Sequence, residues 1–179
     1  SRYPACIWSL REDQLAWHQV HNEAFRRIGG VPAVVRIDNL KTGVARGAGP
    51  WGVINPHYRR YASAVGFHVD ACLPHHPQGK GKTERTIRDL RSQVSPYGHD
   101  WNTLAELQAA TDARIALLAG RRLCAATGRT VAESLVLERD HLAPLPILPE
   151  PFDLALSRTV AVDATVAFEG RRYSVPVAY

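Results

Sequence analysis

The 179-residue chain is 45% hydrophobic and 22% charged. This length and composition predict one globular domain, with room for a small second module, and exclude collagen and coiled coils. The sequence contains no run of 18 apolar residues and no segment typical of a signal peptide, so no membrane association is expected. Three widely spaced cysteines are typical of the reducing cytosol. The chain contains no methionine and begins at Ser1, which indicates a piece of a longer protein.

The net charge of +5 is concentrated in one part of the chain. Residues 41–100 contain nine Lys and Arg against four Asp and Glu, an excess of five, while the rest of the chain is nearly balanced. A local excess of basic residues favours a polyanionic partner, most simply a nucleic acid. A solvated surface of mixed charge explains the same composition.

Hydrophobic periodicity predicts alternating strands and helices in the first half of the chain. Residues 3–9 are predicted to form a buried strand, followed by a helix that Ser9 and Glu12 begin as a capping box and that ends near Ile28. A second strand at 33–37 ends at Asp38 and leads to a glycine-rich loop at 46–52. The pair Asn55-Pro56 begins a helix that ends at Gly66.

A third strand at 67–73 and a polar loop at 74–81 are predicted next, before a helix at 82–94. On that helix Ile87, Leu90 and Val94 are expected to face the core. Further helices are predicted at 104–118 and after Thr130, which forms a capping box with Glu133. Short strands are predicted at 159–162, 165–168 and 172–177, with a turn at 169–170.

This order of elements predicts an α/β protein with two parts. Residues 1–143 are expected to form a three-layer α/β domain whose first strands are parallel. Residues 144–151 contain four prolines and are expected to form a stiff linker. Residues 152–179 are expected to form a small all-β module, similar to part of a barrel.

Two carboxylates are the strongest candidates for chemistry. Asp38 follows a predicted buried strand, and Glu84 begins a helix after the next one, so both are expected at the same edge of the sheet. Carboxylate oxygens beside a basic loop suit Mg²⁺ or Mn²⁺ acting on phosphates. Each residue also has a purely structural explanation, because Asp38 can stabilise a turn and Glu84 suits a helix amino terminus.

Basic residues surround Glu84. Glu84, Arg88 and Arg91 share one helical face, and Lys80 and Lys82 precede them. Such a surface can hold a phosphate backbone near a metal ion. An ordinary surface pair between Glu84 and Arg88 is the alternative explanation.

Other motifs are weaker. Gly81-Lys82-Thr83 resembles the end of a nucleotide-binding P-loop, but His76 occupies the position of its first glycine. The match of residues 47–52 to GxGxxG lacks the flanking strand and helix. His18 and His21 share a helix face, but they are expected to be solvated or hydrogen-bonded rather than zinc ligands, as are the histidines after Cys72.

Three segments carry a family resemblance. IDNLKTGV at 37–44, HPQGKGKTER at 76–85 and RRYSVPVAY at 171–179 together resemble the IstA-type insertion-sequence transposases. These enzymes belong to the superfamily of DDE transposases and retroviral integrases, and the resemblance covers essentially the whole chain.

The resemblance implies a ribonuclease H-like core that cleaves transposon ends and transfers the strands into target DNA, using Mg²⁺ or Mn²⁺. Asp38 and Glu84 would be the second and third acidic residues of the catalytic triad. A homo-oligomer on DNA, a separate helper ATPase and a bacterial cytoplasmic location at the nucleoid are also implied. The residues expected near DNA are Asn39, Lys41, Lys80, Lys82, Arg85, Arg88 and Arg91.

The resemblance also leaves one catalytic residue without a counterpart. The family's first Asp lies on the first strand of the fold, whereas here only Asp13 precedes Asp38, at a predicted helix start. Asp13 is therefore not assigned to the triad, and the first strands are expected to be missing from this chain. The alternative function is a DNA-binding or assembly fragment of a transposase without chemistry of its own.

Overall fold

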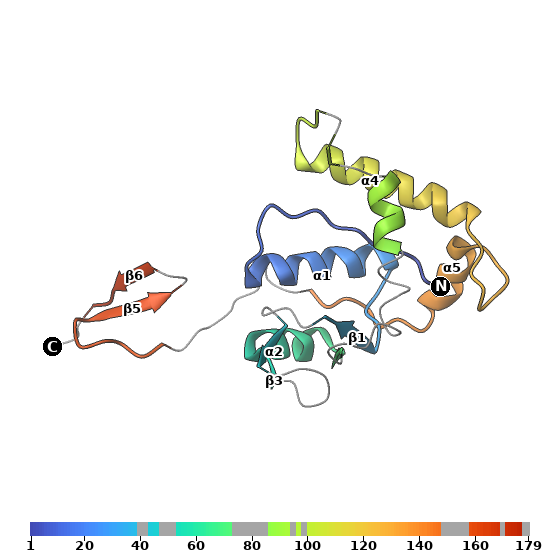
Figure 1. Ribbon diagram of the computed structural model, residues 1–179. Coiled ribbons are helices and arrows are strands. Elements are labelled where there is room, and N and C mark those ends of the chain that lie inside the picture. The colour runs from blue at the N-terminus through green and yellow to red at the C-terminus, as the bar shows by residue number, and fades with distance from the viewer. Residues whose placement is uncertain are drawn as a thin grey trace.

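The computed structural model describes residues 1–38, 43–46, 53–72, 86–93, 96–97, 100–147, 158–168 and 171–176. These residues form a mixed α/β structure, which confirms the predicted class (Figure 1). The helices are α1 (Gln14–Ile28), α2 (Pro56–Val65), α4 (Leu104–Arg121), α5 (Val131–Arg139) and a helical segment at 86–93. The strands are β1 (Val34–Ile37), β2 (Val44–Arg46), β3 (Val53–Ile54), β4 (His68–Ala71), β5 (Thr165–Phe168) and β6 (Arg171–Ser174).

Strands β1 and β4 form the parallel pair that the sequence predicts. Val34 pairs with His68 and Ile37 with Ala71, and α2 lies between the two strands in the sequence. Ile37 and Ala71 are buried on the side that faces the helices, whereas Val34 is 53% exposed on the other. The carboxyl ends of both strands therefore meet at one edge, as expected for a crossover connection.

Two antiparallel hairpins complete the described strands. β2 pairs with β3 through an irregular register, and Gly43 C=O accepts a hydrogen bond of 2.9 Å from Asn55 N–H. The sequence analysis did not predict β2 and β3, the two short strands on either side of the predicted glycine-rich loop. Residues 47–52 of that loop lie outside the described part of the chain. β5 and β6 confirm the hairpin predicted near the carboxyl terminus.

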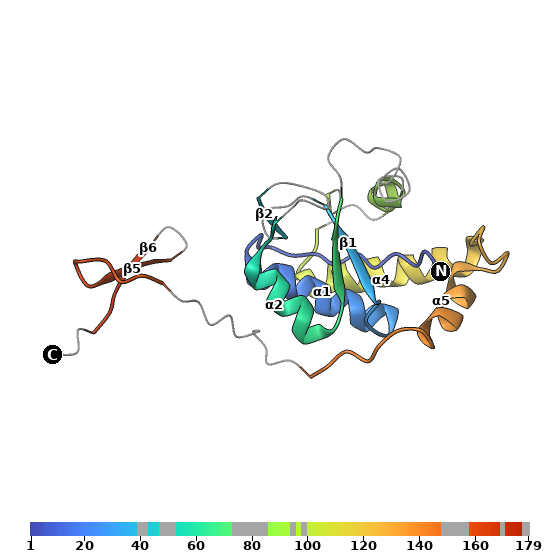
Figure 2. The same cartoon turned by 90° about the horizontal axis from the view of Figure 1, so that it is seen from below.

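Helix α1 lies between α4 on one side and α2 with strands β1 and β4 on the other (Figures 1 and 2). On the α4 side, Arg27 forms a two-pronged ion pair with Asp112, with nitrogen-to-oxygen distances of 2.9 Å. On the α2 side the contact combines aromatic and apolar packing with hydrogen bonds from the Tyr58 and Tyr61 hydroxyls. No helix of the described residues is long and apolar enough to span a membrane.

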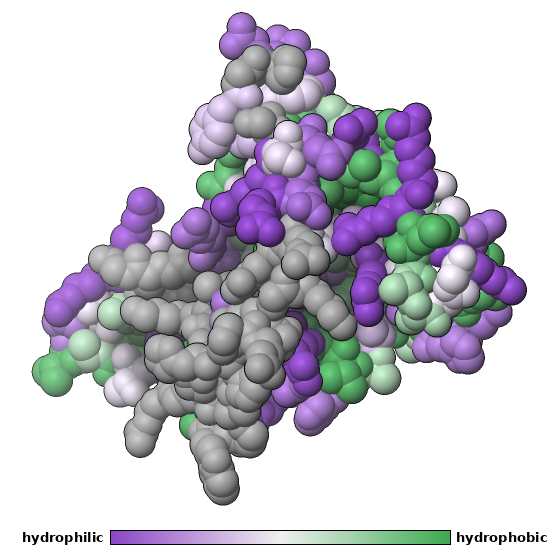
Figure 3. All heavy atoms as spheres, turned by 45° about the vertical axis from the view of Figure 1, so that its right-hand side comes forward, coloured by the Kyte–Doolittle hydropathy of each residue, from purple (hydrophilic) through white to green (hydrophobic). Residues whose placement is uncertain are grey.

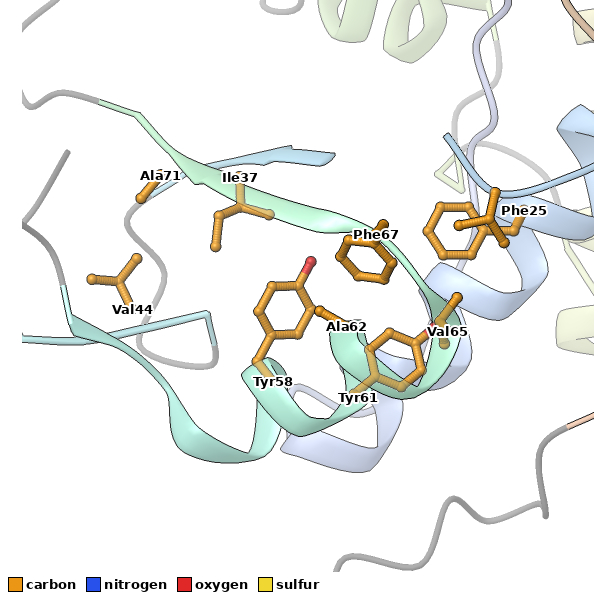
Figure 4. Close-up of a cluster of buried hydrophobic side chains, with 10 residues drawn as sticks. Phe25, Ile37, Val44, Tyr58, Tyr61, Ala62, Val65, Phe67 and Ala71 are labelled. Carbon is orange, nitrogen blue, oxygen red and sulfur yellow. The ribbon is translucent and has the colours of Figure 1, made fainter. Parts of the chain in front are cut away.

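Aromatic rings fill the core between α1, α2 and the parallel strands (Figure 4). Tyr58 and Tyr61 of α2 are fully buried, and Phe67, which precedes β4, lies 5.6 Å from the ring of Phe25 of α1. Rings this close, meeting at steep angles, add packing energy beyond the area they bury. The core thereby fixes α2 against both α1 and β4.

Three helix ends follow from local sequence signals. Asn55 caps α2 with Pro56 at the first helical position, and Gly66 ends it in a left-handed conformation at φ 94°. Thr130 and Glu133 form the predicted capping box of α5. The predicted cap of α1 is wrong: Asp13 is the cap and accepts a 2.8 Å bond from Ala16 N–H.

The predicted strand at 3–9 is also wrong. These residues have no regular secondary structure. Their backbone groups form hydrogen bonds with side chains of α4 and not with a neighbouring strand. Gln108 accepts from Trp8 N–H at 3.0 Å and donates to Cys6 C=O at 2.8 Å. The indole N–H of Trp8 donates to the Thr111 hydroxyl at 2.8 Å.

Other boundaries differ in detail. Residues 159–162 form no strand, since they lead into a turn before β5. The helix predicted at 82–94 is described over 86–93, where Ile87 is 46% exposed and does not face the core. Residues 144–147 have no regular structure, and the rest of the predicted linker and the turn at 169–170 lie outside the described residues.

Two glycines allow a matched test of backbone conformation. Gly66 has φ of 94°, Gly120 lies within α4, and neither has another atom within 4 Å of an added Cβ. We expect Gly66→Ala to lower the free energy of unfolding by about 1 kcal/mol, because a left-handed residue tolerates Cβ poorly. Gly120→Ala should raise it by about 0.5 kcal/mol, because alanine favours a helix. Urea denaturation measures both, and equal shifts would contradict the assigned conformations.

A buried polar network joins α1 to α2. His18 stacks on Tyr61 with ring centroids 4.3 Å apart, and its Nε2 lies 3.0 Å from Gln14 Nε2, which donates to it. Tyr61 donates to Asn22 Oδ1 at 2.6 Å. His21 donates through Nδ1 to Trp17 C=O, so its Nε2 accepts from the Tyr58 hydroxyl at 2.9 Å. Both histidines are therefore hydrogen-bonded in their neutral forms, as the sequence analysis preferred.

Stability should depend on pH through these histidines. Burial lowers the pKa of His18 to about 4 and also lowers the pKa of His21. Below about pH 6.5 these histidines bind protons in the unfolded chain but not in the folded chain. Their contribution to the free energy of unfolding is therefore fully present above about pH 6.5 and is lost as the pH falls towards 4. Each such histidine contributes a slope of at most about 1.4 kcal/mol per pH unit.

The test is urea denaturation of the wild type and His18→Gln at pH 7, 6, 5 and 4.5. Glutamine can still bond to Gln14 but does not titrate, so we expect a shallower fall in stability for this variant. His141→Gln, at an exposed position, is the matched control and should keep the slope of the wild type. An identical slope in His18→Gln and the wild type would contradict the buried, neutral state of His18.

Candidate functional site at the carboxyl edge of the parallel strands

Asp38 lies at the edge where β1 and β4 end. It directly follows β1 and is exposed, while Ile37 before it is buried. Cys72 N–H, one position after β4, donates to Ile37 C=O at 3.0 Å, so the hydrogen bonding between the two strands continues to this edge. The structure therefore places Asp38 where open α/β sheets carry their functional groups, as the sequence predicts.

An ion pair between β1 and β4 lies two positions before Asp38. Arg36 Nε donates to Asp70 Oδ2 at 2.7 Å, and the two residues are directly opposed in the register of β1 and β4. This hydrogen bond to Asp70 raises the pKa of Arg36. Side chains alternate along a strand, so Arg36 and Asp38 share the exposed face. The sequence analysis missed this pair, because it becomes visible only once the register is known.

The helical segment at 86–93 carries the two predicted DNA contacts that the structure describes. Arg88 and Arg91 are both exposed on it. Gln93, at its end, accepts from Arg114 of α4 at 2.7 and 3.1 Å, which holds the segment against α4. Neither Arg88 nor Arg91 forms an ion pair with a carboxylate of the described residues.

The remaining predicted site residues lie outside the described part of the chain. Glu84 is one of them, so its position relative to Asp38 stays a prediction. The same holds for the predicted DNA contacts Asn39, Lys41, Lys80, Lys82 and Arg85.

Among the described residues, no group of three His, Cys, Asp or Glu side chains could hold a metal ion. Asp38 contributes one carboxylate, which is a suitable ligand for Mg²⁺ or Mn²⁺ but is insufficient alone. The carboxylate of Asp13 caps α1 and pairs with Arg11. The bond from Ala16 N–H lowers the pKa of Asp13, as expected for a capping carboxylate. The omission of Asp13 from the triad stays a prediction.

Comparison with known proteins gives a uniform result. The chain is 31% identical over 162 residues to a transposase for insertion sequences IS1326/IS1353 from Pseudomonas aeruginosa, covering 89% of this chain and 31% of that protein. It is 30% identical over 157 residues to the transposase for insertion sequence element IS21 from the same organism, covering 87% of this chain and 40% of that protein. No protein-family model matches the chain.

A relative from another bacterium agrees. The transposase for insertion sequence element IS232 from Bacillus thuringiensis subsp. berliner is 28% identical over 185 residues, covering all of this chain and 42% of that protein. The likeness to insertion-sequence transposases seen in the sequence motifs is thereby confirmed. The chain is homologous to insertion-sequence transposases over a segment that spans less than half the length of each of these relatives.

Proposed function

We propose that this chain is the catalytic part of a DDE-type transposase, in which Asp38 and Glu84 are two of the three acidic residues. The observation that carries this proposal is the position of Asp38, an exposed carboxylate at the carboxyl edge of a parallel strand pair in a homologue of transposases. The ribonuclease H-like core is part of the same proposal. It is supported by parallel β1 and β4 with α2 as their crossover.

The proposed reaction has two transfers at phosphorus. Water attacks a phosphodiester at the transposon end, the bond from phosphorus to the 3′ oxygen breaks, and that oxygen leaves as a 3′ hydroxyl. This hydroxyl then attacks a phosphodiester of target DNA and displaces the 3′ oxygen of the neighbouring nucleotide. Bound Mg²⁺ or Mn²⁺ stabilises the negative charge that develops on the attacking and leaving oxygens.

The residues of this chain have separate roles in the proposal. Asp38 and Glu84 would hold the metal ion, and the exposed Arg88 and Arg91 would hold the DNA backbone through its phosphates. Asp38 directly follows β1, whose register with β4 is fixed as far as Ile37. Asp70 of β4 pairs through Oδ2 with Arg36, so in the proposal it is a neighbouring carboxylate and not a metal ligand.

Metal binding tests the role of the two carboxylates directly. We expect Asp38→Asn and Glu84→Gln each to weaken Mn²⁺ binding to the chain by at least about tenfold, measured from the electron paramagnetic resonance signal of free Mn²⁺. Asp70→Asn removes the same charge from the neighbouring strand and is the matched control, with an expected change below about twofold. Unchanged Mn²⁺ affinity in Asp38→Asn would contradict the assignment.

In the intact transposase, the same two substitutions should abolish cleavage at transposon ends while leaving DNA affinity within about twofold. The metal ligands act on the reacting phosphate, whereas most of the affinity for DNA comes from contacts with other phosphates. The readout is the release of labelled transposon ends, with DNA binding measured on the same preparations. Normal cleavage by either variant would refute the catalytic role.

DNA binding by the chain should depend strongly on salt. If four to six phosphates are contacted, the affinity should fall by roughly 10²- to 10³-fold between 50 and 200 mM salt. Fluorescence anisotropy with a labelled duplex measures this dependence. A flat response would argue against nucleic acid as the partner.

The alternative function is DNA binding or assembly without chemistry. The observation that favours it is that Asp13, the one Asp before Asp38 in this chain, caps α1. A nicking assay with the 179-residue chain and Mg²⁺ separates the two. Strand breaks that disappear in Asp38→Asn support catalysis by this chain, whereas DNA binding without breaks supports the alternative.

A further inference from the structure

A cleft on the α4 side of the molecule is lined by three arginines from two separate segments. Arg2 comes from the amino-terminal segment, and Arg121 and Arg122 come from the end of α4. The cleft has a volume of about 360 Å³, within the range of clefts that bind small ligands or parts of larger ones. Leu118, Ala119 and Val131 supply apolar surface between the charges.

The charges of the cleft are not balanced. None of the three arginines forms an ion pair with a carboxylate of the described residues. Asp89 is the one acidic residue of the lining, so its charged side chains sum to +2. Figure 3 shows the molecule with the α5 side nearer the viewer. Hydrophilic residues alternate there with small apolar patches. An uncompensated positive cleft of this kind favours an anionic ligand.

The backbone that carries the arginines is held in place. Arg2 has φ of 59°, which is uncommon for a residue other than glycine. Both neighbours of Arg2 in the sequence are held by contacts. The Ser1 hydroxyl donates to Glu138 of α5 and accepts from Tyr3 N–H. The side chain of Tyr3 packs into the α4–α5 core. Strained backbone of this kind is maintained by surrounding contacts and often occurs at functional positions.

The end of α4 is fixed as well. Arg122 N–H donates to Leu118 C=O at 2.8 Å, and Arg122 C=O accepts from Val131 N–H at 2.9 Å. The favourable interaction of a cation with a helix carboxyl terminus explains Arg121 alone. It does not explain Arg2, which reaches the same cleft from 119 positions earlier in the sequence.

The cleft uses a different face of the helical segment at 86–93 from that of the predicted DNA contacts. Its lining includes Thr86, Asp89, Leu90 and Gln93, which recur at helical spacing on one face. Arg88 and Arg91 are not part of this lining. The segment therefore separates two basic surfaces, one with Arg88 and Arg91 and one with Arg2, Arg121 and Arg122.

We propose that the cleft formed by Arg2, Arg121 and Arg122 binds the sugar-phosphate backbone of DNA as a second contact surface, separate from the one around Asp38, Arg88 and Arg91. Guanidinium groups bind phosphate oxygens through paired N–H groups, and the apolar floor suits the deoxyribose between phosphates. The proposal rests on the proposed function, because it takes DNA as the partner. The contact is to the backbone, so it carries no sequence preference of its own.

Salt-dependent binding of the chain to a labelled duplex of arbitrary sequence tests the proposal. We expect Arg121→Ala/Arg122→Ala to weaken binding about tenfold or more at 0.1 M salt and to reduce the slope of log affinity against log salt by about 1 to 2, one phosphate for each arginine. Arg121→Lys/Arg122→Lys retains the charges and should keep most of the slope. Thermal unfolding of each variant verifies that α4 is intact.

The matched control is Arg11→Ala/Arg26→Ala. It removes two exposed charges that already pair with Asp13 and Glu23, so we expect less than a twofold loss of affinity and an unchanged slope. If the cleft variant binds DNA as well as this control, the proposal is wrong. The same result is expected if the cleft binds an acidic protein and not DNA. If Arg88→Ala/Arg91→Ala weakens binding and the cleft variant does not, the second surface alone is refuted. Failure of the wild type to bind DNA would overturn the proposed function as well.

Discussion

The register between β1 and β4 determines where Asp38 and the Arg36–Asp70 ion pair lie. Ile37 pairs with Ala71, and Cys72 N–H continues the pairing to Ile37 C=O. A slip of one residue would turn Ile37 to solvent and Asp38 into the core, because side chains alternate along a strand. The buried position of Ile37 and the ion pair between Arg36 and Asp70 both favour the observed register.

The aromatic core keeps this register in place. Tyr58 and Tyr61 of α2 pack against Phe67 at the start of β4, and the histidines of α1 pack on the same rings. The buried hydroxyls of Tyr58 and Tyr61 each have a hydrogen-bond partner on α1, as buried polar groups generally do. The end of the strand pair that carries Asp38 therefore rests on a rigid base, which a metal ligand requires.

Local signals in the sequence predicted the elements that depend on local chemistry. Asn55-Pro56, Gly66 and the Thr130–Glu133 box each define a helix end by bonds within a few residues. The run of β-branched residues before Asp38 predicted β1, because such residues favour strands. The likeness to insertion-sequence transposases was visible in short motifs, and the comparisons with relatives confirm it.

Features that depend on distant residues could not be predicted. Residues 3–9 have the composition of a strand, but Gln108 and Thr111 of α4, about 100 positions away, bind Trp8 and Cys6 instead. Ser9 has the pattern of a cap, yet it bonds with Arg11 and leaves the cap of α1 to Asp13. The cleft with Arg2 arises only in the folded chain. The Arg121–Arg122 doublet at a helix end was the one local signal for it.

The central claim is that Asp38 and Glu84 share a metal ion. A crystal structure of the chain with Mn²⁺, with the metal located by its anomalous scattering, measures this most directly. The account predicts a metal ion about 2.0–2.3 Å from a carboxylate oxygen of Asp38 and from one of Glu84. Carboxylates separated by more than about 12 Å, without a shared ion, would contradict it, since two metal ions of one site lie only about 4 Å apart.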